Sequence, residues 1–103
     1  MTYNLIVSKE AHEDIDAIVH YIANELANPT AAVTLLNDVE KSYHAVVENP
    51  SMYSLCHDAR LSSKGYRKIV VKNYLILYRV DDEAKAVLIV RIIYGGRNYA
   101  DLI

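Results

Sequence analysis

Arginine and tyrosine side chains gather in the last third of the sequence, and together they could act on a phosphodiester. The set comprises Arg67, Arg79, Arg91, Arg97, Tyr66, Tyr94 and Tyr99. Guanidinium groups bind phosphates through paired hydrogen bonds and stabilise the charge that develops during cleavage, whereas tyrosines stack on bases or transfer a proton. Such a set could serve a ribonuclease that needs no metal. The alternative is structural: the tyrosines pack at a sheet margin and the arginines neutralise carboxylates on neighbouring helices.

The other candidate motifs do not form a chemical site. His12-Glu13 resembles the start of a zinc-protease helix, but Asp16 stands where the second histidine ligand would lie. Adjacency of Cys56 and His57 does not bring a thiol and an imidazole together for nucleophilic catalysis. The Gly95-Gly96 pair lacks the spacing and the following helix of a phosphate-binding loop. We therefore expect neither a metal nor another cofactor.

Composition predicts one small folded domain over residues 1–103. The chain is 52% hydrophobic and 23% charged, which is typical of a globular protein with a single core. Its one cysteine cannot form an internal disulfide. The first ten residues contain no basic leader, and no segment approaches the roughly 20 apolar residues of a membrane span. We expect a cytoplasmic protein that does not engage a membrane.

The formal charge of −2 is distributed unevenly along the chain. Residues 1–63 carry three basic and nine acidic side chains, whereas residues 64–103 carry eight basic and four acidic ones. The simplest interpretation is that the solvated faces of the N-terminal helices are acidic. The cationic second half would also attract an anionic partner, such as a phosphate backbone or an acidic peptide.

Three apolar runs in the second half predict an antiparallel meander. They span residues 69–71, 74–80 and 86–94, and short polar segments separate them. With short turns fixing the register, alternate side chains divide between two faces. The predicted core face carries Ile69, Val71, Tyr74, Ile76, Tyr78, Val80, Leu88, Val90, Ile92 and Tyr94. The predicted second face carries Tyr66, Lys68, Val70, Leu75, Leu77, Arg79, Val87, Ile89, Arg91 and Ile93.

The second face is too apolar to be left in water and too cationic for a sealed core. Contiguous apolar surface rimmed by cations usually marks a region that a partner covers. The alternative is that the chain's own N-terminal strand and C-terminal tail cover part of this face, while the arginines extend to solvent.

The first half predicts a short strand followed by two helices. Residues 3–7 suit a strand, and Ser8 is a helix N-cap that begins a first helix of residues 9–26. Asn28-Pro29 places a cap and a proline at the start of a second helix, which ends at Asn49-Pro50. Residues 51–64 form an irregular link. The predicted class is α+β: an N-terminal strand, an antiparallel helix hairpin, then a three-stranded antiparallel meander that completes one sheet.

Several motifs in this order resemble the RelE/ParE superfamily of toxins from bacterial type II toxin–antitoxin modules. They are the A-x-x-D-I opening at residues 11–15, Tyr21-Ile22, Asn49-Pro50, Gly65-Tyr66-Arg67 ahead of N-Y-L-I-L-Y at residues 73–78, and the closing residues 91–99. The likeness covers essentially the whole chain. It implies the same fold, growth arrest, and silencing by a cognate antitoxin in a hetero-oligomer. The antitoxin's C-terminal helix or strand would cover the sheet or the helix hairpin.

The resemblance also implies roles for individual residues. Arg97 matches the last-strand arginine of RelE-like sites, Tyr99 stands in for their C-terminal tyrosine, and Arg67 matches the arginine before the central strand. These three are the expected catalytic residues if the chain is an enzyme. The residues expected to bind the target or its phosphates are Arg79, Arg91, Lys68 and Tyr94. Those expected to bind the antitoxin are Leu75, Leu77, Val87, Ile89 and Ile93.

The resemblance leaves two targets open. ParE-type members inhibit DNA gyrase and cut nothing, whereas RelE-type members are ribosome-dependent endonucleases of messenger RNA. Leu75 stands where RelE-type enzymes usually carry an arginine, no histidine follows His57, and an acidic chain is poorly suited to the phosphates of a ribosome. We therefore favour gyrase. The alternatives are a metal-free messenger RNA endonuclease that acts with the ribosome, and a non-toxic relative that only binds an antitoxin.

Overall fold

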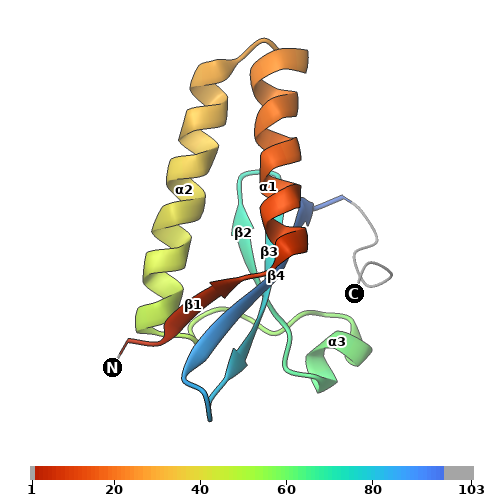
Figure 1. Cartoon of the computed structure of the whole chain (residues 1–103). Helices are drawn as coiled ribbons and strands as arrows, with labels where there is room; N and C mark the ends of the chain where they lie inside the picture. The colour runs from red at the N-terminus through yellow and green to blue at the C-terminus, as the bar shows by residue number, and fades with distance from the viewer. Residues whose placement is uncertain (1, 97–103) are drawn as a thin grey trace.

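A four-stranded sheet with a helix hairpin on one face forms the body of the protein (Figure 1). The computed structural model describes residues 2–96. In chain order the elements are β1 (Asn4–Val7), α1 (Lys9–His20), the π-helical turn η1 (Tyr21–Glu25), α2 (Pro29–Glu48), α3 (Ala59–Ser63), β2 (Arg67–Val71), β3 (Tyr74–Asp81) and β4 (Ala86–Tyr94). The sheet order is β1-β4-β3-β2. Strands β2, β3 and β4 pair antiparallel as predicted, whereas β1 lies parallel to β4, so the sheet is mixed.

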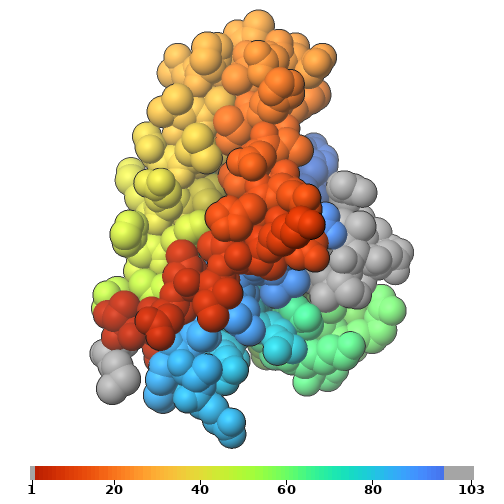
Figure 2. Space-filling model, viewed as in Figure 1, coloured from red at the N-terminus to blue at the C-terminus, as the bar shows by residue number. Residues whose placement is uncertain are grey.

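The two long helices begin at the caps that the sequence predicts. The Ser8 hydroxyl accepts a hydrogen bond from the Ala11 amide at 3.0 Å, and the Asn28 side chain accepts one from the Ala31 amide at 3.1 Å. The first helix passes into η1 instead of continuing as an α-helix, because the Leu26 amide donates to the Tyr21 carbonyl five residues earlier. In the space-filling view the two helices form the upper half of the molecule and extend beyond the strands (Figure 2).

A β-bulge in β4 makes part of the predicted face assignment wrong. Leu77 lies opposite Arg91, but the next residue, Tyr78, lies opposite Ile89, so Val90 is an extra residue in β4. One extra residue exchanges the faces of every side chain before it. Val87 and Ile89, predicted to lie on the second face, are therefore in the main core beneath the helices, with 0% and 1% of their surface exposed.

Part of the second face is covered by the link between α2 and β2, a segment that was not expected to cover it. Leu75, Leu77 and Ile93 lie on this face as predicted, yet they are buried in a smaller core. The residues that bury them belong to the link between α2 and β2 and include Cys56, Leu61 and Tyr66. This link contains α3, a five-residue helix that was not predicted, and the Asp58 carboxylate caps it. A hydrophobic core thus lies on each side of the sheet.

Tyr78 ties the start of this link to the main core. Its side chain is fully buried, and its hydroxyl donates a hydrogen bond to the Pro50 carbonyl at 2.8 Å. The ring of Tyr53 packs edge-on against it, with ring centroids 6.3 Å apart. Burial raises the pKa of Tyr78 to about 12. One buried tyrosine therefore fixes where the chain leaves α2 and turns beneath the sheet.

Replacing Tyr78 by phenylalanine should lower the free energy of unfolding by about 1 to 2 kcal/mol, because the Pro50 carbonyl loses its partner while the ring packing is kept. Urea unfolding measures this. Tyr43→Phe is the matched control: no side-chain hydrogen bond of Tyr43 occurs among residues 2–96, and its removal should change stability by less than about 0.5 kcal/mol. Equal losses for the two variants would contradict the assigned role.

Alkaline pH should destabilise the protein through its two buried tyrosines. Burial raises the pKa of Tyr43 and of Tyr78 from 10.0 to about 12 each, so the folded state holds their protons more tightly than the unfolded state. Their contribution to stability is complete below pH 10 and is lost as the pH rises towards 12. Urea midpoints measured across this range should fall more steeply for the native chain than for the Tyr43→Phe/Tyr78→Phe double variant. Parallel pH profiles would refute the assignment.

Candidate functional site

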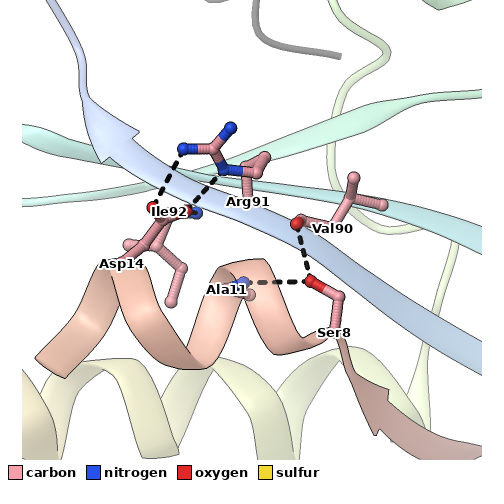
Figure 3. Close-up of polar contacts among 6 residues, drawn as sticks. All are labelled: Ser8, Ala11, Asp14, Val90, Arg91 and Ile92. Carbon is pink, nitrogen blue, oxygen red and sulfur yellow. Dashed lines mark hydrogen bonds and ion pairs between the residues drawn. The ribbon is translucent and has the colours of Figure 1, made fainter.

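Arg91 and Asp14 form a two-point ion pair between β4 and α1 (Figure 3). The guanidinium donates through Nε to Asp14 Oδ2 at 2.7 Å and through its terminal nitrogen to Oδ1 at 2.9 Å. Both side chains are largely buried, with 22% and 16% of their surface exposed. The hydrogen bonds that Arg91 donates to Asp14 raise the pKa of Arg91. The predicted phosphate-binding role of Arg91 would therefore have to compete with this pair.

The same helix caps the edge of β4 beside the bulge. Strand β1 pairs with β4 only as far as Ile89, which leaves the next stretch of the edge without a strand neighbour among residues 2–96. There the Ser8 hydroxyl donates to the Val90 carbonyl at 2.8 Å, and Asp14 Oδ2 accepts from the Ile92 amide at 3.0 Å (Figure 3). The motif at residues 11–15 is thus a structural device: Ala11 has no exposed surface, and Asp14 holds the strand edge.

Arg67, an expected catalytic residue, holds the α2–β2 link. One terminal nitrogen of its guanidinium donates to the Tyr53 carbonyl and lies 3.5 Å from the Ser51 carbonyl. Its β-strand partner is Tyr78, which anchors the same link at Pro50. These contacts turn the guanidinium towards the protein backbone. Sequence reasoning missed this role because nothing in residues 51–53 signals that their carbonyls need a donor.

Lys68 and Arg79 are the cations that the second face presents. Each is half-buried, and the register places both on the side of buried Leu77. The Arg79 guanidinium carbon lies 5.5 Å from the centre of the Tyr66 ring, a cation–π contact. These two residues are the expected target-binding side chains that the structure brings together.

Tyr94 lies at the far end of β4, apart from that pair. Its side chain is 53% exposed, and its ring packs edge-on against Tyr74 at 6.0 Å between centroids. The expected catalytic residues Arg97 and Tyr99 lie outside the described residues. Among the described residues expected to bind the target, Tyr94 is the one nearest in sequence to Arg97 and Tyr99.

Cys56 and the histidines do not assemble into a reactive group. Burial raises the pKa of the Cys56 thiol, which disfavours the nucleophilic thiolate. Among residues 2–96, no three His, Cys, Asp or Glu side chains lie close enough together to hold a metal ion. Over the same residues, no helix is both long enough and apolar enough to cross a membrane.

The helix hairpin exposes apolar side chains that no other described part of the chain covers. Tyr21, Leu26 and Val33 have 50% or more of their surface exposed, and Leu36 has 38%. Beside them, a groove of about 470 Å³ runs between the hairpin and the β2–β3 turn, lined by residues that include Leu26, Leu35 and Tyr74. Exposed apolar surface of this kind usually serves protein–protein contact.

Comparison with known protein families shows to which family the chain belongs. Residues 5–99 match the model of the ParE toxin of the type II toxin–antitoxin system parDE. This chain belongs to that family. It is a toxin of the type II toxin–antitoxin class. The resemblance identified from the sequence is confirmed. No curated protein gave a match.

Solved structures confirm the fold of this ParE-family toxin. A chain of the chromosomal ParDE system from P. aeruginosa aligns with a TM-score of 0.68 and 20% identity, covering 90% of this chain and 96% of that one. A double mutant of the RelE toxin from E. coli, in its free state, aligns with a TM-score of 0.68 and 17% identity, covering 99% of this chain and 93% of that one. A chain of the RelBE2 toxin–antitoxin complex from Mycobacterium tuberculosis aligns with a TM-score of 0.64 and 19% identity, covering 91% of this chain and 99% of that one.

Replacing Asp14 by alanine should lower the free energy of unfolding of this ParE-family toxin by about 3 kcal/mol, because it leaves Arg91 and the Ile92 amide without their partner. Urea unfolding gives the value. Asp38→Ala is the control, since Asp38 meets Lys72 only at 3.7 Å and at the surface, where such a pair contributes less than about 1 kcal/mol. A loss at Asp14 no larger than at Asp38 would show that the buried pair is not required.

Two arginine variants separate a structural from a surface role. Arg67→Ala should lower the free energy of unfolding by about 1.5 to 3 kcal/mol, because charged hydrogen bonds to the link are lost. It should also speed proteolytic cleavage within residues 50–56. Arg79→Ala should lower the free energy of unfolding by less than about 1 kcal/mol and leave the rate of proteolytic cleavage unchanged. Unfolding and limited proteolysis of both variants test this. A stable, protease-resistant Arg67→Ala protein would return Arg67 to the candidate catalytic residues.

Proposed function

We propose that this toxin arrests growth by inhibiting DNA gyrase, cuts no nucleic acid itself, and is held inactive by a cognate antitoxin. The observation that carries the choice of target is the engagement of Arg67 with the backbone of the α2–β2 link. A nuclease that used this arginine would need its guanidinium directed at the scissile phosphate, where it could stabilise the developing charge. Here the guanidinium is held by the fold.

Two further properties support gyrase over the ribosome. Leu75, at the position where RelE-type enzymes usually carry an arginine, is buried in the smaller core with 8% of its surface exposed. A formal charge of −2 also provides little of the electrostatic attraction that binding to a phosphate-rich ribosome requires. Both properties fit a toxin that binds a protein target.

The exposed apolar side chains of the helix hairpin support an antitoxin at that surface. Structural neighbours include toxin–antitoxin complexes from Mycobacterium tuberculosis and E. coli, so an antitoxin partner is expected for this chain as well. The antitoxin-binding residues predicted on the second face, from Leu75 to Ile93, have at most 8% exposed surface and are poor candidates for direct contact. Leu26 and Val33 on the hairpin are accessible in their place.

Expression without an antitoxin should arrest growth, and the purified toxin should inhibit DNA supercoiling by gyrase while leaving messenger RNA intact. Supercoiling is followed on plasmid DNA, and primer extension maps messenger RNA ends in a cell-free translation reaction with and without ribosomes. Ribosome-dependent cuts would overturn the gyrase target and establish a RelE-type endonuclease. No growth arrest by the native chain would identify a non-toxic relative.

Replacing Leu26 by aspartate should weaken binding of the antitoxin encoded beside this gene by at least tenfold, because it puts a charge into an apolar contact. Met52→Asp is the control, since Met52 is similarly exposed, at 52% against 55%, but lies in the α2–β2 link. Calorimetric titration of both variants gives the affinities. Equal weakening, or a loss at Met52 alone, would place the antitoxin elsewhere.

A further inference from the structure

We propose that Arg79 and Lys68 bind the phosphate backbone of duplex DNA, so that this toxin recognises gyrase together with its DNA. The inference rests on the proposed gyrase function and names a second component of the complex that the toxin engages. It assigns the second face of the sheet to DNA and the helix hairpin to the antitoxin. The two partners would then use separate surfaces.

The strand register brings the two cations together. Lys68 on β2 lies directly opposite Leu77 on β3, and Arg79 follows two residues later on the same face. Diagonal neighbours of this kind lie about 7 to 8 Å apart, so both heads can reach phosphates of one DNA strand. Both side chains are half-buried, and their stems lie beside the fully buried Leu77. Their heads are therefore held close to the sheet surface.

Neither cation is neutralised by a carboxylate within residues 2–96. The ion pairs there join Arg60 to Asp58, Lys72 to Asp38 and Arg91 to Asp14. A half-buried cation loses part of its hydration, and an anion that replaces the lost water is favoured. The arginine can bind phosphate with paired hydrogen bonds, and the lysine acts as a point charge.

Contact with Tyr66 favours a duplex backbone over single-stranded RNA. Proteins that bind single strands stack bases on open aromatic rings. Here the guanidinium of Arg79 occupies one face of the Tyr66 ring, and the ring itself packs against the smaller core. The tyrosine therefore orients the arginine and offers little room to a base. What remains at this surface is a pair of phosphate ligands without a stacking platform.

The acidic character of the chain does not oppose this assignment. Helices α1 and α2 pack against the core face of the sheet, on the opposite side from Lys68 and Arg79. Asp14 of α1 reaches the edge of β4, where Arg91 neutralises it, and Asp58 on the link side of the sheet pairs with Arg60. Two phosphate contacts give weak, sequence-independent binding. Docking on gyrase would raise the effective concentration of DNA at this face, so that two weak contacts would add to the affinity of the whole complex.

Fluorescence anisotropy with a fluorescein-labelled 20-base-pair duplex tests the inference on the purified toxin. We expect weak binding whose affinity falls by about tenfold between 50 and 200 mM salt, because two phosphate contacts give a slope of about −1.8. Arg79→Ala and Lys68→Ala should each reduce the magnitude of the slope of the logarithm of the association constant against the logarithm of the salt concentration by about 1. Lys41→Ala removes the same charge from α2 and should leave the slope unchanged. No detectable duplex binding, or an equal effect of Lys41→Ala, would overturn the proposal, as would tighter binding to single-stranded RNA of the same length.

Gyrase assays on the same variants distinguish this inference from the function on which it rests. The Arg79→Ala/Lys68→Ala variant should need at least tenfold more protein than Lys41→Ala to inhibit supercoiling, while still binding immobilised gyrase in the absence of DNA. Undiminished inhibition by the double variant would remove the DNA contact and leave the gyrase function standing. No inhibition by the native toxin would remove the gyrase function itself, whatever the duplex titration shows.

Discussion

The polar contacts between the start of α1 and the bulged edge of β4 are the constraint on which the rest of the structure depends. A bulge leaves backbone groups without ladder partners, and such groups are costly when they are withdrawn from water. Ser8 and Asp14 supply those partners at the Val90 carbonyl and the Ile92 amide, and Arg91 completes the charge balance. The helix hairpin, the main core and the side-chain faces of β4 are all set by this one junction.

Arginine is used for two different purposes in this fold. Arg67 and Arg91 are bound to backbone carbonyls and to Asp14, where they fix the α2–β2 link and the strand edge. Arg79 has no carboxylate partner among residues 2–96 and rests on a tyrosine ring at the surface. Of these three arginines, Arg79 is the one whose guanidinium is available to a phosphate. This division is why the proposed target surface is smaller than the arginine content suggests.

Element types and order were predictable because they depend on local signals. The caps at Ser8 and Asn28 and the apolar spacing of both helices are satisfied within a few residues, and short turns fix the antiparallel pairing. The bulge at Val90 was not predictable, because the backbone groups beside it find their hydrogen-bond partners in Ser8 and Asp14, some 80 residues away in the chain. Val87 and Ile89 were assigned to the wrong face for that reason. Helix α3 was missed because five residues carry too weak a periodicity.

The sequence by itself determined the family, the α+β class and the set of cations available to bind a target, since these follow from composition, local propensity and ordered motifs. Tertiary structure decided which of those cations are free. It showed that the chain's own link buries Leu75, Leu77 and Ile93 on the second face. It also showed that Arg67 and Arg91 are occupied and that Arg79 and Lys68 share the remaining surface of that face. The physical reason is that a guanidinium takes whichever partner the fold brings within hydrogen-bonding reach, and that partner is set by contacts between segments far apart in the chain.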